Sequence, residues 1–127
     1  MKLFLILSSV VFLATEKSCK KQKALDTCFK GRLEVKGGCM NYTISLQEGN
    51  MDTSWYVKEW TDDHSGKQYQ NVFALGSRCN FPANINEGDE FYFTIDSLAP
   101  QDCAVCMMYY PVPGKKLMIK VQDQPCE

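Results

Sequence analysis

The stretch Cys79–Ile95 reads CNFPANINEGDEFYFTI and joins a cysteine to a turn and then to a strand. Residues 87–89 supply the turn, because glycine tolerates a positive φ and aspartate bonds to its own backbone. The residues that follow are aromatic or β-branched, and Phe91, Phe93 and Ile95 alternate onto one face. We therefore predict a central core strand over residues 91–95 whose entry is held by a disulfide at Cys79.

The rest of the chain shows the same period-two alternation of apolar and polar side chains. The alternation is most regular over residues 39–47, where Met40, Tyr42, Ile44 and Leu46 form the apolar face. Further strands are predicted over residues 29–36, 53–60, 69–75, 105–110 and 116–121, with a hairpin loop over 61–67 and a helix or turn over 97–103. Many short strands without a long helix predict an all-β barrel or sandwich with minor helix.

The N-terminal segment has the pattern of a secretory signal. Lys2 is followed by an apolar run over residues 3–14, which is too short to span a bilayer. We predict that residues 1–15 are removed, with cleavage between 14 and 18, and that residues 16–127 form a single exported domain. The sequence contains no second apolar run, so no membrane span is predicted. The formal net charge of −1 disfavours a nucleic-acid partner.

Seven cysteines in a short exported chain predict a disulfide framework. They are Cys19, Cys28, Cys39, Cys79, Cys103, Cys106 and Cys126. The odd number leaves one cysteine either as a buried thiol or as the bridge of a disulfide-linked dimer. Cys103 and Cys106 form a C-x-x-C, which we interpret as structural because no βαβ pattern surrounds it.

Few residues point to chemistry. His64 is the only histidine and lies in a loop among Asp62, Asp63 and Ser65; a metal site would need further Cys or His ligands, and no nucleophile motif stands near it. The expectation is a protein that is not an enzyme and has no catalytic residue, metal site or cofactor. Asn41-Tyr42-Thr43 is an acceptor for N-glycosylation, with Asn41 predicted on the polar face of its strand.

The cysteines and the central strand carry a resemblance that covers nearly the whole mature chain. An arm with Cys19 precedes a first strand led by Cys28, and Cys79 precedes a glycine turn and the central strand. This arrangement resembles the netrin-like module, the OB-type five-stranded barrel of tissue inhibitors of metalloproteinases (TIMP N-terminal domain) and of small excretory-secretory proteins of nematodes such as hookworms. The resemblance implies Cys28 paired with Cys126, and Cys19 paired with Cys79, Cys103 or Cys106; Cys39 is then additional.

The resemblance also implies a function, with one departure. These inhibitors chelate zinc through an N-terminal C-x-C, whereas this chain has a lone Cys19 followed by two lysines. We therefore expect a secreted protein that binds an extracellular protein, of a host or of the matrix, without zinc chelation. The alternative is a metalloproteinase inhibitor with a contact ridge of Cys19, Lys20, Lys21, Gly76, Ser77 and Arg78. A third hypothesis, from the aromatic content, is a carrier of a small apolar ligand.

A second resemblance is local. Residues 93–102 resemble the turn before the second cysteine of an immunoglobulin variable domain, residues 116–120 resemble its last strand, and Trp55 would be its core tryptophan. The position of the hallmark cysteine, however, holds Met108. An immunoglobulin-like β-sandwich is therefore the alternative fold.

Overall fold

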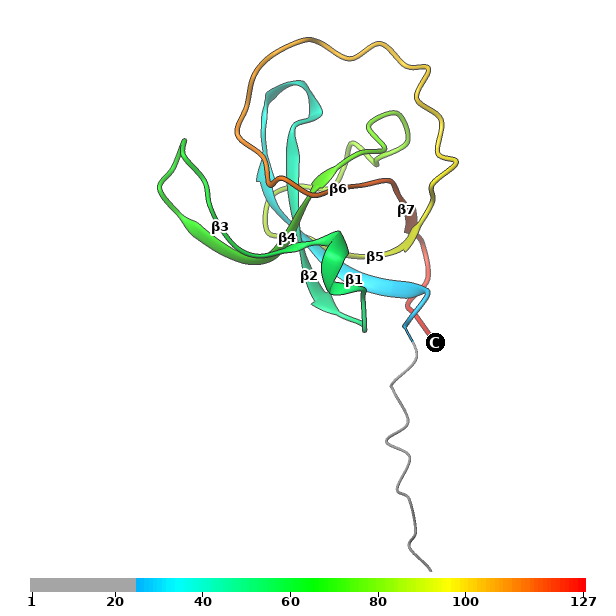
Figure 1. Ribbon diagram of the computed structural model, residues 1–127. Helices are drawn as coiled ribbons and strands as arrows, with labels where there is room; N and C mark the ends of the chain where they lie inside the picture. The colour runs from blue at the N-terminus through cyan, green and yellow to red at the C-terminus, as the bar shows by residue number, and fades with distance from the viewer. Residues whose placement is uncertain (1–24) are drawn as a thin grey trace, which may run out of the picture.

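The computed structural model describes residues 25–127, so the predicted signal segment and Cys19, Lys20 and Lys21 lie outside the described residues. The elements are β1 (Cys28–Lys36), η1 (Gly38–Met40), β2 (Tyr42–Glu48), η2 (Thr53–Trp55), β3 (Val57–Thr61), β4 (Gln68–Leu75), β5 (Glu90–Ile95), β6 (Lys116–Leu117) and β7 (Ile119–Gln122) (Figure 1). The all-β class with minor helix is confirmed. No helix within residues 25–127 is long and apolar enough to cross a membrane.

The strands form one sheet in the order β3-β4-β2-β1-β5-β7. Every pairing along this order is antiparallel. β6 lies off it and pairs with β4 in parallel, through Ala74 opposite Lys116 and Leu75 opposite Leu117. The C-terminal segment thus hydrogen-bonds to β4 through β6 and to β5 through β7. β3 and β4 form the hairpin that projects from the body in Figure 1.

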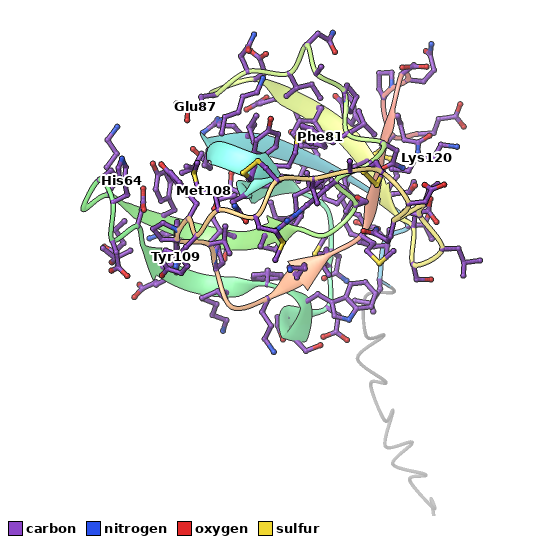
Figure 2. All side chains as sticks on the ribbon, turned by 90° about the horizontal axis from the view of Figure 1, so that it is seen from above. His64, Phe81, Glu87, Met108, Tyr109 and Lys120 are labelled. Carbon is purple, nitrogen blue, oxygen red and sulfur yellow. A yellow bond between two sulfur atoms is a disulfide. The ribbon has the colours of Figure 1, made fainter. Side chains whose placement is uncertain are left out.

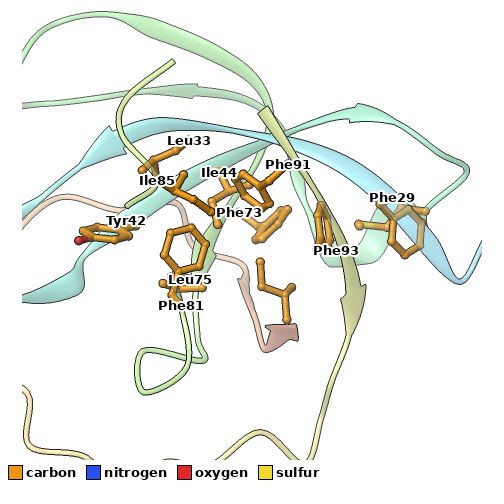
Figure 3. Close-up of a cluster of buried hydrophobic side chains, with 12 residues drawn as sticks. Phe29, Leu33, Tyr42, Ile44, Phe73, Leu75, Phe81, Ile85, Phe91 and Phe93 are labelled. Carbon is orange, nitrogen blue, oxygen red and sulfur yellow. The ribbon is translucent and has the colours of Figure 1, made fainter. Parts of the chain in front are cut away.

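The core contains aromatic rings from β1, β4 and β5 that pack together among aliphatic side chains (Figure 3). Phe93 is fully buried, and its ring centroid lies 5.5 Å from that of Phe29, 5.7 Å from Phe73 and 6.0 Å from Phe91. Gly31 makes this packing fit, because an added Cβ there would lie only 2.9 Å from the Phe93 ring. The prediction that Phe91 and Phe93 face the core is confirmed, and β5 lies between β1 and β7.

Three of the predicted strands are wrong in detail. The strand predicted over residues 39–47 begins only at Tyr42, because residues 38–40 form η1. Residues 53–55 form η2 rather than the start of a strand, since the Asp52 carboxylate accepts a hydrogen bond from the Ser54 N–H (2.8 Å) and caps the turn. Residues 97–103, predicted as a helix or turn, contain a turn at 97–98, whereas residues 105–110 have no regular secondary structure. Their apolar character reflects a different role, described below.

The immunoglobulin-like alternative disagrees with the structure. A sandwich needs two sheets packed face to face, whereas the described strands all belong to one sheet. Trp55, its expected core tryptophan, is exposed on η2. The local likeness of residues 93–102 arises because a turn that follows a strand has similar composition in many β folds.

We expect Phe93→Ala to lower the free energy of unfolding by about 3–5 kcal/mol, because it removes a fully buried ring and leaves a cavity. Urea unfolding without reductant measures this change. Tyr109→Ala is the control, because it removes a similar ring from the surface and should change stability by about 0.5 kcal/mol or less. Equal effects of the two variants would show that the core is not centred on Phe93.

Candidate functional site

The candidate site lies on the long connection between β5 and β6. We call residues 97–113 the strap; Figure 1 shows it as the yellow-to-orange arc between the two strands. Because it forms no strand, the sheet does not hold it along its length. Two disulfides do so instead: Cys103 is bonded to Cys79, and Cys106 is bonded to Cys39.

One side of the strap packs against the β1–β2 connection. The Tyr110 ring approaches Gly37 so closely that an added Cβ there would lie 2.6 Å from a ring carbon. Met108 lies similarly over Gly38, with its sulfur 2.9 Å from the position of an added Cβ. The two glycines therefore provide the space in which the strap lies. The Tyr110 ring also contacts His64 of the β3–β4 loop, at 5.3 Å between centroids.

The connection beneath the strap has an unusual backbone. Cys39 and Met40 have φ values of 57° and 60°, in the left-handed region that non-glycine residues rarely adopt. Such conformations cost free energy and persist only where the surroundings impose them. Here the disulfide from Cys39 to Cys106 ties this strained turn directly to the strap.

The other side of the strap presents apolar side chains to solvent. Met107 is 99% exposed and Tyr109 is 87% exposed, and Met108, whose sulfur lies over Gly38, is still 59% exposed. Val105 and Leu98 extend the exposed apolar surface along the same segment. Figure 2 shows Met108 and Tyr109 on the side of the molecule that carries His64, opposite Lys120. Neighbouring exposed apolar residues on a rigidly held loop are typical of an interaction surface.

Two shallow hollows flank the strap, and Arg78 lines both. The first, of about 410 Å³, lies between Val105 of the strap and Lys116 and Met118 of the C-terminal segment. The second, of about 350 Å³, is lined by Asn41 and Arg78 and by Met107 and Tyr109 of the strap. Arg78 is partly buried, and its Nη2 donates a hydrogen bond to Asn41 Oδ1 over 2.9 Å. The site therefore combines exposed apolar side chains with a fixed guanidinium group.

The prediction that Asn41 faces solvent is wrong. Asn41 is 8% exposed, and its Nδ2 donates hydrogen bonds to the carbonyl oxygens of Gly38 (2.8 Å) and Met108 (3.0 Å). A glycan would replace one of these two hydrogens, so this geometry opposes the predicted N-glycosylation. The polar face of β2 is buried more widely, since Thr43 and Ser45 are buried as well.

The contact ridge predicted for an inhibitor is only partly accessible. Ser77 is fully buried: its Oγ donates to the carbonyl oxygen of Ile119 (2.7 Å) and accepts from the Ile119 N–H (2.8 Å). Gly76 donates its N–H to the Leu117 carbonyl oxygen and lies against β6. These two residues join β4 to the C-terminal segment; Gly76 lines the first hollow, and Arg78 is the member of the 76–78 group that lines both.

The disulfides confirm one expected pairing and correct another. Cys28 is bonded to Cys126, as the netrin-like resemblance implies. The pairing of Cys19 with Cys79, Cys103 or Cys106 is wrong, because Cys79 and Cys103 bond to each other and Cys106 bonds to Cys39. Cys39 is thus a partner of the strap rather than an extra cysteine, and Cys19 itself lies outside the described residues.

A charged cluster covers the outer faces of β1 and β5, away from the strap. The Arg32 guanidinium donates to the Glu90 carboxylate at 2.8 Å, and Lys30 lies 3.0 Å from the same carboxylate. Hydrogen bonds from Arg32 and then Lys30 lower the pKa of Glu90, while the hydrogen bond to Glu90 raises the pKa of Lys30. Because these charges pair with one another on an open surface, we interpret the cluster as a solvated sheet face.

The candidate metal and catalytic residues remain few in the structure. His64 is exposed at the β3–β4 turn, where its backbone N–H donates a hydrogen bond to the Asp62 carboxylate over 2.9 Å. Within residues 25–127, no three His, Cys, Asp or Glu side chains are arranged to hold a metal ion. The strap was missed as a site because residues 105–110 have the composition of a core strand; the two cysteines beside them were the signal that they are held at the surface.

We expect Gly37→Ala to displace the strap and to lower the free energy of unfolding by about 1–3 kcal/mol, because the new methyl group meets Tyr110 and the Asn41 carbonyl. Gly114→Ala is the matched control, since an added Cβ there meets open space. Denaturant unfolding measures the loss, and protease cleavage within the strap reports its release. Two variants of equal stability and equal resistance would contradict the close contact.

We expect non-reduced peptide mapping by mass spectrometry to recover three cross-linked pairs: Cys28 with Cys126, Cys39 with Cys106, and Cys79 with Cys103. Each pair is identified by its mass before and after reduction. A peptide that links Cys19 to any of these six cysteines would contradict the arrangement of the strap.

No protein-family model, curated protein or solved structure matches the chain.

Proposed function

We propose that the chain is a secreted netrin-like module with an OB-type barrel. The pairings support this: β1 pairs with β2 and β5, β2 with β4, and the C-terminal segment with both β4 and β5, as expected when five strands follow one another around a barrel. The bridge from Cys28 to Cys126 is the one that the resemblance implies. Three disulfides also fit a protein that folds in an oxidising compartment.

In this proposal the module acts by binding another extracellular protein through the strap. The observation that carries it is the exposure of Met107, Met108 and Tyr109 on a segment fixed by two disulfides. Exposed apolar groups weaken solubility and favour aggregation, so a fixed surface of this kind is best explained by a partner that covers it. Fixing the loop in advance also lowers the entropic cost of binding.

The two alternatives receive less support. The inhibitor hypothesis relied on a ridge in which Cys19 is joined to the 76–79 loop, but Cys79 pairs with Cys103 and Ser77 is buried. The carrier hypothesis relied on the aromatic content. The rings of Phe29 and Phe73 both pack against the ring of Phe93 in the core instead of lining a cavity.

To test the function, a photo-crosslinking amino acid replaces Tyr109 and the protein is exposed to a mixture of extracellular proteins. The same group at Lys120, on β7 and on the opposite side of the molecule from Tyr109 in Figure 2, is the control. A protein captured only from position 109 is then purified, and its affinity is measured with Met107→Ser/Tyr109→Ser. We expect a loss of at least about ten-fold, because truncating buried interface anchors costs 1.4 kcal/mol or more.

The double variant should keep the free energy of unfolding to within about 1 kcal/mol, since both side chains are exposed. Unchanged affinity of the purified partner for this folded variant would contradict the strap as the contact face.

A further inference from the structure

Arg78 lies at the junction of the two hollows in a fixed position. Its Nη2 donates to Asn41 Oδ1, and the amide of Asn41 is in turn held by the carbonyl oxygens of Gly38 and Met108. The next residue in the chain, Cys79, is bonded to Cys103 of the strap. The guanidinium is therefore attached to the strap both through the Asn41 hydrogen bond and through the neighbouring disulfide, and it is partly withdrawn from solvent.

The charge of Arg78 has no counter-ion in the described part of the chain. No carboxylate of residues 25–127 forms an ion pair with Arg78. Arg32, by contrast, forms ion pairs with both Glu34 and Glu90. The charged side chains that line the two hollows are Arg78 and Lys116, and both are cationic. A guanidinium carries five N–H donors in a planar fork that matches a carboxylate, and Asn41 accepts from one of its nitrogens.

We propose that the partner places a carboxylate on Arg78 and apolar side chains against Met107 and Tyr109. The ligand class is a protein segment in which an aspartate or glutamate stands next to apolar residues. This inference rests on the proposed function, in which the strap is the contact face. Complementary charge at the centre of an apolar contact fixes the register of a partner and rejects segments that lack the acid.

Two other occupants fit the surface less well. A second copy of the chain, related by a two-fold axis, would place this cationic patch against itself. A bilayer would have to accept a strap whose backbone is not hydrogen-bonded within a strand, and such groups are costly in hydrocarbon. An acidic and apolar protein segment satisfies both the charge of Arg78 and the exposed side chains.

The probe is a phage-displayed library of random twelve-residue peptides, selected on the folded full-length protein without reductant. Selected peptides are synthesised, and their affinities are measured for the unchanged protein and for Met107→Ser/Tyr109→Ser, Arg78→Gln, Arg78→Lys and Lys120→Gln. Lys120→Gln removes a single positive charge on the opposite side of the molecule from Met108 and Tyr109 (Figure 2). Each peptide is also made with its acid replaced by the matching amide, which tests the carboxylate without changing the protein.

We expect peptides that depend on Met107 and Tyr109 to carry an acid and to bind Arg78→Gln about ten-fold more weakly. Replacing the acid by the amide should weaken the affinity of the peptide for the unchanged protein by a similar factor. The same replacement should change the affinity for Arg78→Gln little, because both changes remove the same contact. Arg78→Lys should bind better than Arg78→Gln, and Lys120→Gln should bind like the unchanged protein.

Other outcomes separate the two proposals. Strap-dependent peptides without an acid, or equal affinity for Arg78→Gln, would overturn the carboxylate and leave the strap as the contact face. A failure to select any strap-dependent peptide would overturn both. Strap-dependent binding to phosphatidylcholine–phosphatidylserine vesicles, or dimerisation lost in Met107→Ser/Tyr109→Ser, would also overturn the acidic partner in favour of a bilayer or a second copy.

Discussion

The packing of Phe93 against Phe29 and Phe73 is the contact on which the rest of the structure depends. It joins β5 to β1, its sheet neighbour, and to β4, which is separated from β5 by two strands of the sheet order. Because β5 is held in this way, its end at Ile95 is fixed, and the pairing of β6 with β4 fixes the point to which the chain returns. The strap must cross between these two points, so the aromatic core determines where the candidate site lies.

The three disulfides have two different structural roles. The bridge from Cys28 to Cys126 closes a separation of 98 residues and joins the start of β1 to the end of the chain. The bridges at Cys103 and Cys106 instead hold a segment that makes no sheet ladder. Cross-links of this kind restrict the unfolded chain, and they allow a surface segment to remain ordered without burying its own side chains. Apolar residues can then be kept exposed at a fixed place.

Local alternation predicts β1 and β5 well because both strands bury one face against the core, so their burial follows the period of two. It fails at Asn41, whose burial comes from Arg78 and from the Met108 carbonyl, residues far away in the chain. It also fails for residues 105–110, because an apolar run has the same composition in a core strand and on an exposed strap. The pairing of seven cysteines has many solutions, so the anchors of the strap need the three-dimensional structure.

The hydrogen bond to Asn41 does not by itself explain why an arginine occupies position 78. Asn41 Oδ1 needs a single donor, and a neutral amide or hydroxyl group would supply it at a smaller desolvation cost than a partly buried guanidinium. The charge is therefore in excess of what the fold requires. The desolvation of this extra charge slightly destabilises the free protein, and only a bound anion offsets that cost. The geometry around Asn41 thus links a feature of the fold, the buried polar face of β2, to the recognition of a carboxylate at the strap.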